Sequence, residues 1–339
     1  MNKTLLILVL FFSTYINAQT VTGTVLDSHE EPILGASVYF DGTLYGTTTD
    51  IDGKFSFNIK SSINAPLVVS FVGFEKIYLK DVNFNRRYKF ILQESTETLK
   101  EVVVLSNEFS RKQMMTVFKK QFLGVTKAGK KCTIENEEEL YFIYDKKELT
   151  LKAFADKPLI INNPFLGYKV YFDLNSFDAK FHKYSMNNSA IYSSIYVGTS
   201  RFEEISNSVK IIDNREKTFK GSFLEFFRNF AKMEFRRDKF LLFYKAFQDD
   251  PNNHFTAIDS LDVTHIKIVP QERGLKSKDF VAEFSLLYDR REQSKIIFHT
   301  DNFIIDKYGL FSNYEKIYFS GALSEKKVGD MLPSNYGIE

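Results

Sequence analysis

The stretch of residues 32–57 constrains the fold most, because it alternates in the way that half-buried strands do. Val38 and Phe40 alternate with polar or small neighbours, and the same pattern returns further along the stretch. Asp52-Gly53 lies between two such runs, and its glycine can supply the positive φ that a tight hairpin turn needs. Period-two alternation between turn residues is typical of antiparallel strands, so this stretch predicts hairpins of a β-sheet.

The alternation continues on both sides and predicts seven strands within residues 20–93. These strands are Thr20–Leu26, Ala36–Phe40, Leu44–Thr49, Lys54–Ile59, Pro66–Val72, Glu75–Leu79 and Tyr88–Leu92. The segment that begins at Thr48 is similar to a calcium loop, but with Gly53 at the sixth position its twelfth position is Ile59. An EF-hand needs an acidic residue there, so a hairpin turn is the better interpretation.

Four short stretches resemble the carboxypeptidase regulatory-like domain. They are Val21-Thr-Gly-Thr-Val-Leu-Asp, Pro32-Ile-Leu-Gly-Ala-Ser-Val, Gly46-Thr-Thr-Thr-Asp-Ile-Asp-Gly-Lys-Phe-Ser-Phe and Val69-Ser-Phe-Val-Gly-Phe-Glu. The resemblance covers residues 19–94 and implies a seven-stranded, transthyretin-like or Ig-like β-sandwich that is not catalytic. It also implies a secreted or outer-membrane protein of the kind common in Bacteroidetes.

The resemblance to the carboxypeptidase regulatory-like domain ends in a polar linker, residues 95–106. Glu101-Val-Val-Val also follows this domain in TonB-dependent receptors, but the remaining chain is too short for their plug and barrel. Further stretches resemble the second half of secreted Bacteroidetes proteins that carry the same N-terminal domain, and that half has no established activity. These stretches are Asp156-Lys-Pro-Leu-Ile-Ile-Asn-Asn, Leu166-Gly-Tyr-Lys-Val-Tyr-Phe-Asp-Leu, Gly221-Ser-Phe-Leu-Glu-Phe-Phe-Arg and Met331-Leu-Pro-Ser-Asn-Tyr.

Residues 1–18 have the features of a signal peptide. Lys3 provides the positive charge, Leu5–Phe12 is apolar throughout, and a cut is expected before Gln19. The apolar run is too short to span a bilayer, and no later run predicts a transmembrane segment. We therefore expect an exported protein that is periplasmic or associated with the outer membrane or cell surface. Its 45 basic and 43 acidic residues argue against nucleic acid as a partner.

Residues 107–339 predict a larger, antiparallel, β-rich domain with helices near 108–123 and 222–237. The strands predicted before the second helix are Glu139–Tyr144, Glu148–Ala153, Leu159–Ile161, Tyr168–Leu174, Ala179–Tyr184 and Ala190–Val197, with β pattern as far as Ile212. Residues 257–319 are again strand-like, and Pro333-Ser-Asn is expected to be a turn in a polar tail.

The second helix begins with a capping box, Ser222 to Glu225, and has a strongly apolar face. This spacing predicts that Phe227 and Phe230 are buried and that Arg228 points into solvent.

The first helix joins an apolar face to a basic one. Met114, Val117, Phe118 and Phe122 share one side, while residues 111–131 contain seven lysines and arginines and no acid. Such a helix can lie on an anionic membrane, or it can dock on the second domain with its basic face in solvent. We favour docking, because an acidic run at Glu135–Glu139 follows and could neutralise the charge.

No stretch forms a recognisable catalytic or metal-binding constellation. Gly124–Lys131 lacks the final Ser or Thr of a P-loop and has a helix before it and a strand after it, which is the reverse of the required order. Ser324–Lys327 fits Ser-x-x-Lys, a short and common pattern. Cys132, the single cysteine, is expected to be buried.

The five histidines are scattered along the chain. The loop of Asp249–His254 has enough oxygens to hold a cation, although a solvated turn is favoured. His265 and His299 lie in strand-like runs and could meet across a sheet.

The sequence therefore predicts no catalytic, cofactor-binding or metal-binding residue and no cofactor. It favours a non-enzymatic cell-envelope protein with a binding or assembly role, whose partner is an envelope protein, a peptide or a glycan. Two alternatives stay open: a hydrolase with an unrecognised site in the C-terminal domain, and an accessory of a TonB-dependent receptor.

Overall fold

The computed structural model describes residues 19–59, 65–95, 109–272, 274 and 276–338. The predicted signal peptide and nearly all of the predicted linker lie outside these residues. The chain divides into two compact units, of which the first ends at Thr96 and the second begins at Glu97 and also includes Asp41–Leu44. The fold is mainly β, as predicted.

The first unit is a sandwich of seven strands, and each of them lies where the alternation predicts one. Its sheets have the orders β4-β1-β7 and β3-β2-β5-β6. The strands are β1 Gln19–Leu26, β2 Ser37–Phe40, β3 Gly46–Thr48, β4 Lys54–Ile59, β5 Leu67–Ser70, β6 Ile77–Leu79 and β7 Arg87–Ile91.

The two sheets of the sandwich share one core. Val25 of the first sheet and Phe40 of the second are both fully buried in it. The predicted turn before β4 is also present, since Gly53 has a φ of 68°. Asp50 Oδ1 accepts hydrogen bonds there from the amides of Asp52 and Lys54, which leaves the carboxylate engaged within a hairpin turn.

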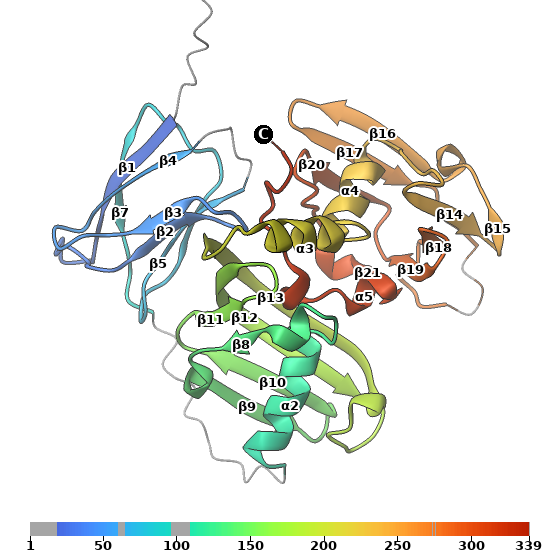
Figure 1. Cartoon of the computed structure of the whole chain (residues 1–339), viewed down its shortest axis with the longest axis horizontal. Helices are drawn as coiled ribbons and strands as arrows, with labels where there is room; N and C mark the ends of the chain where they lie inside the picture. The colour runs from blue at the N-terminus through green and yellow to red at the C-terminus, as the bar shows by residue number, and fades with distance from the viewer. Residues whose placement is uncertain (1–18, 60–64, 96–108, 273, 275, 339) are drawn as a thin grey trace, which may run out of the picture. The chain divides into compact units, whose positions relative to one another are not determined.

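The second unit begins with a six-stranded sheet in the order β8-β11-β12-β10-β9, with β13 along the other side of β12. Helix α2 lies across one face of this sheet (Figure 1). The elements are α2 Arg111–Phe122, β8 Thr133–Ile134, β9 Leu140–Asp145, β10 Thr150–Ala155, β11 Leu159–Asn163, β12 Tyr168–Phe181 and β13 Ile191–Glu204.

Two predictions for this region are wrong. The expected break between residues 174 and 179 is absent, because β12 continues through it with a register shift between Leu174 and Ser176. The β pattern expected as far as Ile212 is replaced by helix α3, Val209–Phe219. Arg215 anchors this helix: its guanidinium donates to the carbonyls of Leu166 and Ser206 and pairs with Glu204.

The rest of the unit has a five-stranded sheet, β15-β14-β18-β19-β21, and a three-stranded sheet, β16-β17-β20. Helix α4, Phe223–Ala231, joins the core that both sheets share. The other elements are β14 Phe240–Tyr244, β15 Phe247–Gln248, β16 Phe255–Ser260, β17 Val263–Ile268, β18 Ala282–Tyr288, β19 Glu292–Phe298, β20 Asn302–Asp306, β21 Ile317–Gly321 and α5 Ala322–Glu325.

Helix α4 ends six residues before the predicted position 237, at a turn where Met233 has a φ of 54°. The C-terminal tail is not simply polar, because Val328 and Leu332 are buried against the core under α2. Its predicted turn is present, with the amide of Tyr336 bonded to the carbonyl of Pro333.

Candidate functional site

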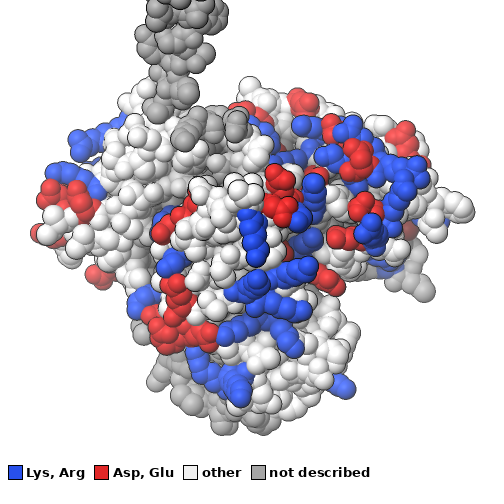
Figure 2. Space-filling model, in the orientation of Figure 1, with Lys and Arg blue, Asp and Glu red and all other residues white. Residues whose placement is uncertain are grey.

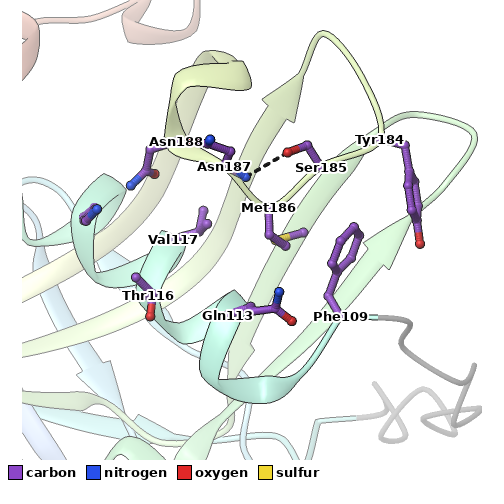
Figure 3. Close-up of a pocket in the computed structure, with 10 residues that line it drawn as sticks. Phe109, Gln113, Thr116, Val117, Tyr184, Ser185, Met186, Asn187 and Asn188 are labelled. Carbon is purple, nitrogen blue, oxygen red and sulfur yellow. Dashed lines mark hydrogen bonds between the residues drawn. The ribbon is translucent and has the colours of Figure 1, made fainter.

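A shallow groove of about 580 Å³ lies on the second unit between α2 and the tip of the hairpin that joins β12 to β13 (Figure 3). Phe109, Gln113, Thr116, Val117 and Lys120 line it from the helix side. Residues 184–188 line it from the hairpin side. The groove is open to solvent and not an enclosed cavity.

The helix side of the groove is fixed by a capping box. Ser110 is the N-cap of α2: its hydroxyl accepts from the amide of Gln113, and the Gln113 side chain accepts from the Ser110 amide at 2.9 Å. Phe118 and Phe122, one turn or more further on, are fully buried against the sheet. The polar residues of α2 therefore face the groove from a helix that cannot rotate.

The hairpin side is held by short polar turns. Ser185 Oγ accepts from the amide of Asn187 at 3.0 Å, which is the dashed line in Figure 3. Asn187 Oδ1 in turn accepts from the amide of Ser189, so it caps the short helical turn Asn188–Ala190, which precedes β13. The side chain of Asn188 reaches across to Gln121 of α2 at 3.4 Å. These hydrogen bonds fix the shape of the hairpin side of the groove.

Aromatic rings form one end of the groove. Phe109 and Tyr184 lie 4.9 Å apart between ring centroids, and both contact Tyr144 behind them. Tyr184 is 45% exposed and so presents ring surface to a ligand. Met186 adds apolar surface between the two sides of the groove (Figure 3), whereas Val117, which is also in the lining, is only 1% exposed.

The lining residues decide what chemistry the groove supports. They supply amides, hydroxyls, aromatic rings and one cation, Lys120, but no carboxylate, histidine or cysteine. Such a set can stack, donate and accept hydrogen bonds, and attract negative charge.

The surface around the groove is basic. Lys112, Lys120, Lys127 and Lys130 are exposed, and within the described parts of the chain none of them has an acidic partner. On the face shown in Figure 2, Lys and Arg side chains gather over the part of the second unit that carries α2 and the segment after it.

The acidic run that follows does not neutralise this surface. Glu137 pairs with Lys119, but Glu139 pairs with Lys157 and Glu135 pairs with Lys169. Among the residues that the structure describes, Lys119 is therefore the one lysine of α2 with an acidic partner. The helix docks by its apolar face, which leaves the basic face in solvent.

Cys132 is buried, and its thiol donates to the carbonyl of Ala128. Burial and the nearby Asp330 raise its pKa to about 12, which keeps the sulfur protonated and unreactive. The segment Gly124–Lys131 follows a helix and precedes a strand, so it has the wrong context for a phosphate loop.

The oxygens of the loop before β16 are used within the loop. His254 Nε2 lies 2.9 Å from Asp249 Oδ2, and Asn253 donates to the same carboxylate. The hydrogen bond from His254 holds the pKa of Asp249 below its usual value. His265 pairs with Ile258 and Ile304 in the three-stranded sheet, whereas His299 follows β19 in the other sheet. Among the described residues no group of three or more His, Cys, Asp or Glu could hold a metal ion.

The two side chains of the Ser-x-x-Lys pattern have separate partners. Ser324 Oγ donates to the carbonyl of Gly321, while Lys327 Nζ lies 3.5 Å from Ser194 Oγ. Burial lowers the pKa of Lys327, and a lysine of lowered pKa beside a hydroxyl is one arrangement of a base and a nucleophile. The hydroxyl of Ser194 already donates to Gln121 Oε1 at 2.9 Å, and neither residue lines the groove.

The hairpin side of the groove was not predicted from the sequence, because Tyr184 was expected to end a strand and not to lie in a loop. The run Ser185-Met-Asn-Asn-Ser is rich in turn residues and could have indicated a loop. The Ser110-x-x-Gln113 capping box was also readable.

Residues 21–104 match the family model of the CarboxypepD_reg-like domain. The N-terminal unit is a CarboxypepD_reg-like domain. This confirms the resemblance that the sequence predicted, and the seven-stranded sandwich agrees with it. The match does not extend to the groove or to the rest of the second unit.

Two curated relatives each match about a third of this chain. The TonB-dependent receptor SusC of Bacteroides thetaiotaomicron is 38% identical over 120 residues, which are 34% of this chain and 12% of the receptor. The TonB-dependent receptor P39 of Formosa agariphila is 35% identical over 104 residues, which are 29% and 10% of the two chains. The chain thus spans about a tenth of the length of the curated relatives it matches.

A solved structure of a DUF3823 family protein from Bacteroides ovatus aligns with 56% of this chain and 82% of its own, at 12% identity. The TM-score is 0.18, a value at which the two folds share no demonstrated arrangement. None of the helices in the described ranges is long and apolar enough to cross a membrane.

Proposed function

We propose that this chain is a non-enzymatic binding protein of the cell envelope, and that its groove holds an anionic oligosaccharide. The observation that carries the proposal is the lining of the groove, which combines exposed aromatic surface with amides, hydroxyls and Lys120 and lacks any carboxylate. Sugar rings stack on aromatic faces and exchange hydrogen bonds with amides and hydroxyls. The unpaired lysines around the groove add attraction for acidic groups.

The envelope location rests on two supports. One is the likeness of the N-terminal unit to parts of TonB-dependent receptors. The other is the predicted signal peptide at residues 1–18. Both favour export, and neither depends on the groove.

The groove can be tested by calorimetric titration with sulfated and uronate-containing oligosaccharides, with neutral glucan oligomers as the comparison. Tyr184→Ala and Lys120→Gln should each weaken binding of the acidic oligomers about tenfold, or about 1.4 kcal/mol. Tyr318→Ala is a matched control, because Tyr318 is 46% exposed but lies on β21 in another sheet. Absence of binding to any oligosaccharide, or an equal loss in Tyr318→Ala, would contradict the proposal.

Assembly with a TonB-dependent receptor is a second candidate, favoured by the similarity of the N-terminal unit to the receptors. It predicts that a receptor barrel co-purifies with the whole chain and is lost when residues 19–95 are removed. Retention of the receptor without those residues would assign the contact to the second unit.

A further inference from the structure

A pocket of about 470 Å³ lies at one end of the five-stranded sheet of the second unit. Five residues line this arginine pocket: Arg237, Asp238, Asp289, Arg290 and Arg291. The register of the sheet sets Phe240, where β14 begins, opposite Tyr288, where β18 ends. The turn before β14 and the turn after β18 therefore reach the same end of the sheet, and the pocket lies between them.

Arg290 occupies a backbone position that ordinarily takes glycine. The amide of Arg291 donates to the carbonyl of Tyr288 at 3.0 Å, which closes the turn between β18 and β19. The two central residues of this turn, Asp289 and Arg290, have φ angles of 44° and 57°. Such a turn favours Asn or Asp at the first central position and glycine at the second, because glycine adopts a positive φ without strain. The hairpin itself therefore does not explain why an arginine stands there.

The other turn places a second arginine at the pocket. The amide of Lys239 donates to the carbonyl of Arg236 at 2.9 Å, so Arg237 and Asp238 are the central residues of that turn. Arg236 Nε lies 3.2 Å from Asp238 Oδ1, and Arg236 is not part of the lining. One of the two carboxylates of the pocket is therefore already neutralised from outside it.

The guanidinium groups of the pocket are poorly neutralised. In the part of the chain that the structure describes, no ion pair or hydrogen bond involves the side chain of Arg237 or Arg290, and both are exposed. Arg291 Nε approaches Asp289 Oδ2 only to 4.0 Å. Glu292, the next acid along the chain, belongs to an ion pair with a lysine outside the pocket. The pocket thus gathers positive charge that the protein leaves without a counter-charge.

We propose that the arginine pocket binds a phosphate monoester group. A guanidinium is planar and binds an oxyanion through two parallel hydrogen bonds. Two unpaired guanidinium groups match the charge of about −1.5 to −2 that a phosphate monoester carries near pH 7. The open pocket leaves room for the molecule that bears the phosphate. None of its residues lines the groove beside α2, so the proposal does not depend on the function proposed for that groove.

Arg290→Gly tests the site and leaves a turn that the backbone favours, so the variant should stay folded. Arg237→Gln removes the other unpaired charge. Lys245→Gly is the matched control, because Lys245 is an exposed cation with a φ of 46° in the turn between β14 and β15 of the same sheet. In titrations of the full chain with methyl phosphate, followed by phosphorus NMR, each arginine variant should bind at least about tenfold more weakly than the wild type. Lys245→Gly should bind as the wild type does.

Two further probes distinguish the sources of the phosphate. Flotation of the full chain with phosphatidylcholine vesicles that contain phosphatidic acid, lost in Arg290→Gly, would assign the phosphate of a lipid headgroup. Binding of glucose 6-phosphate without flotation would assign a soluble phosphate ester. The proposal is overturned if the wild type does not bind methyl phosphate, or if dimethyl phosphate, a diester with a single charge, binds as tightly. It is also overturned if Lys245→Gly weakens binding as much as Arg290→Gly.

Discussion

Arg228 lies on α4 and holds the C-terminal segment through backbone carbonyls. Its Nε, Nη1 and Nη2 donate to the carbonyls of Tyr308, Tyr336 and Ser334 at 2.9, 2.8 and 2.7 Å. The helical spacing predicts a solvent-facing arginine, and this is wrong. Periodicity distinguishes apolar from polar positions. It cannot indicate hydrogen-bond acceptors that lie more than 100 residues away in the sequence, as those of Ser334 and Tyr336 do.

Arg228→Ala should therefore lower the free energy of unfolding by about 2–4 kcal/mol, because it leaves three carbonyls without their donor. Arg236→Ala is the matched control: Arg236 is exposed and pairs with Glu234 and Asp238, so its loss should cost about 1 kcal/mol or less. Urea unfolding followed by circular dichroism measures both. Equal, small changes in the two variants would show that Arg228 is solvated after all.

Asp330 gives the stability of the second unit a pH dependence. Burial raises its pKa above the ordinary 3.8, although Thr126 Oγ1 and the Lys327 amide donate to its carboxylate. A raised pKa in the folded state means that folding favours the protonated form. The contribution of Asp330 to the free energy of unfolding is thus fully present below about pH 4, and it is lost as the pH rises through the pKa that Asp330 has in the folded state.

Asp330→Asn should abolish this loss, because the amide oxygen keeps the two hydrogen bonds and carries no charge. The variant should gain stability relative to the wild type as the pH rises from about 4 to 7. Urea unfolding at several pH values measures the difference. A constant difference over this range would mean that Asp330 does not titrate between folded and unfolded states.

At the scale of the element, α4 is structural. Phe227 and Phe230 are fully buried among rings from both sheets, including Phe303. Phe227→Ala or Phe230→Ala should each lower the free energy of unfolding by about 3–5 kcal/mol. Lys232→Ala, at an exposed position just after the helix, is the control. Unchanged thermal stability together with loss of a pull-down partner would instead make this face a docking surface.

The sequence predicts an element well when one face of it is buried. The strands of the first unit alternate because each has a core side, and α4 shows its phenylalanines at helical spacing. Helix α3 was not predicted, because only two of its residues, Arg215 and Thr218, are buried. Arg215 is held by hydrogen bonds, which hydrophobic periodicity does not indicate.

The groove could be predicted only in part, for a related reason. The basic face of α2 is readable in the sequence, because residues 111–131 contain no acid. The other side of the groove is the tip of the β12–β13 hairpin, and its position depends on where β12 ends. Alternation of residue types does not predict the bulge that lets β12 continue. Two elements form this groove, so its geometry depends on where the hairpin lies relative to α2. The pairing of the strands within the sheet sets that position.

At the scale of the whole molecule, the first unit has a core of its own. Its buried residues include Val21, Phe40, Phe55, Leu67 and Phe90, and they form one cluster drawn from both of its sheets. A unit with its own core and two complete sheets can fold alone. We therefore expect residues 19–95 to give a single cooperative unfolding transition in urea when they are expressed without the rest of the chain.

Two substitutions in that fragment test whether this core, rather than contact with the second unit, supports it. Phe40 is fully buried, so Phe40→Ala should cost about 3–5 kcal/mol. Phe57 packs edge-on against Phe40 but is only half-buried, so Phe57→Ala should cost distinctly less. If the fragment unfolds without cooperativity, or if the two alanine variants are equally mild, the sandwich depends on the second unit for its stability.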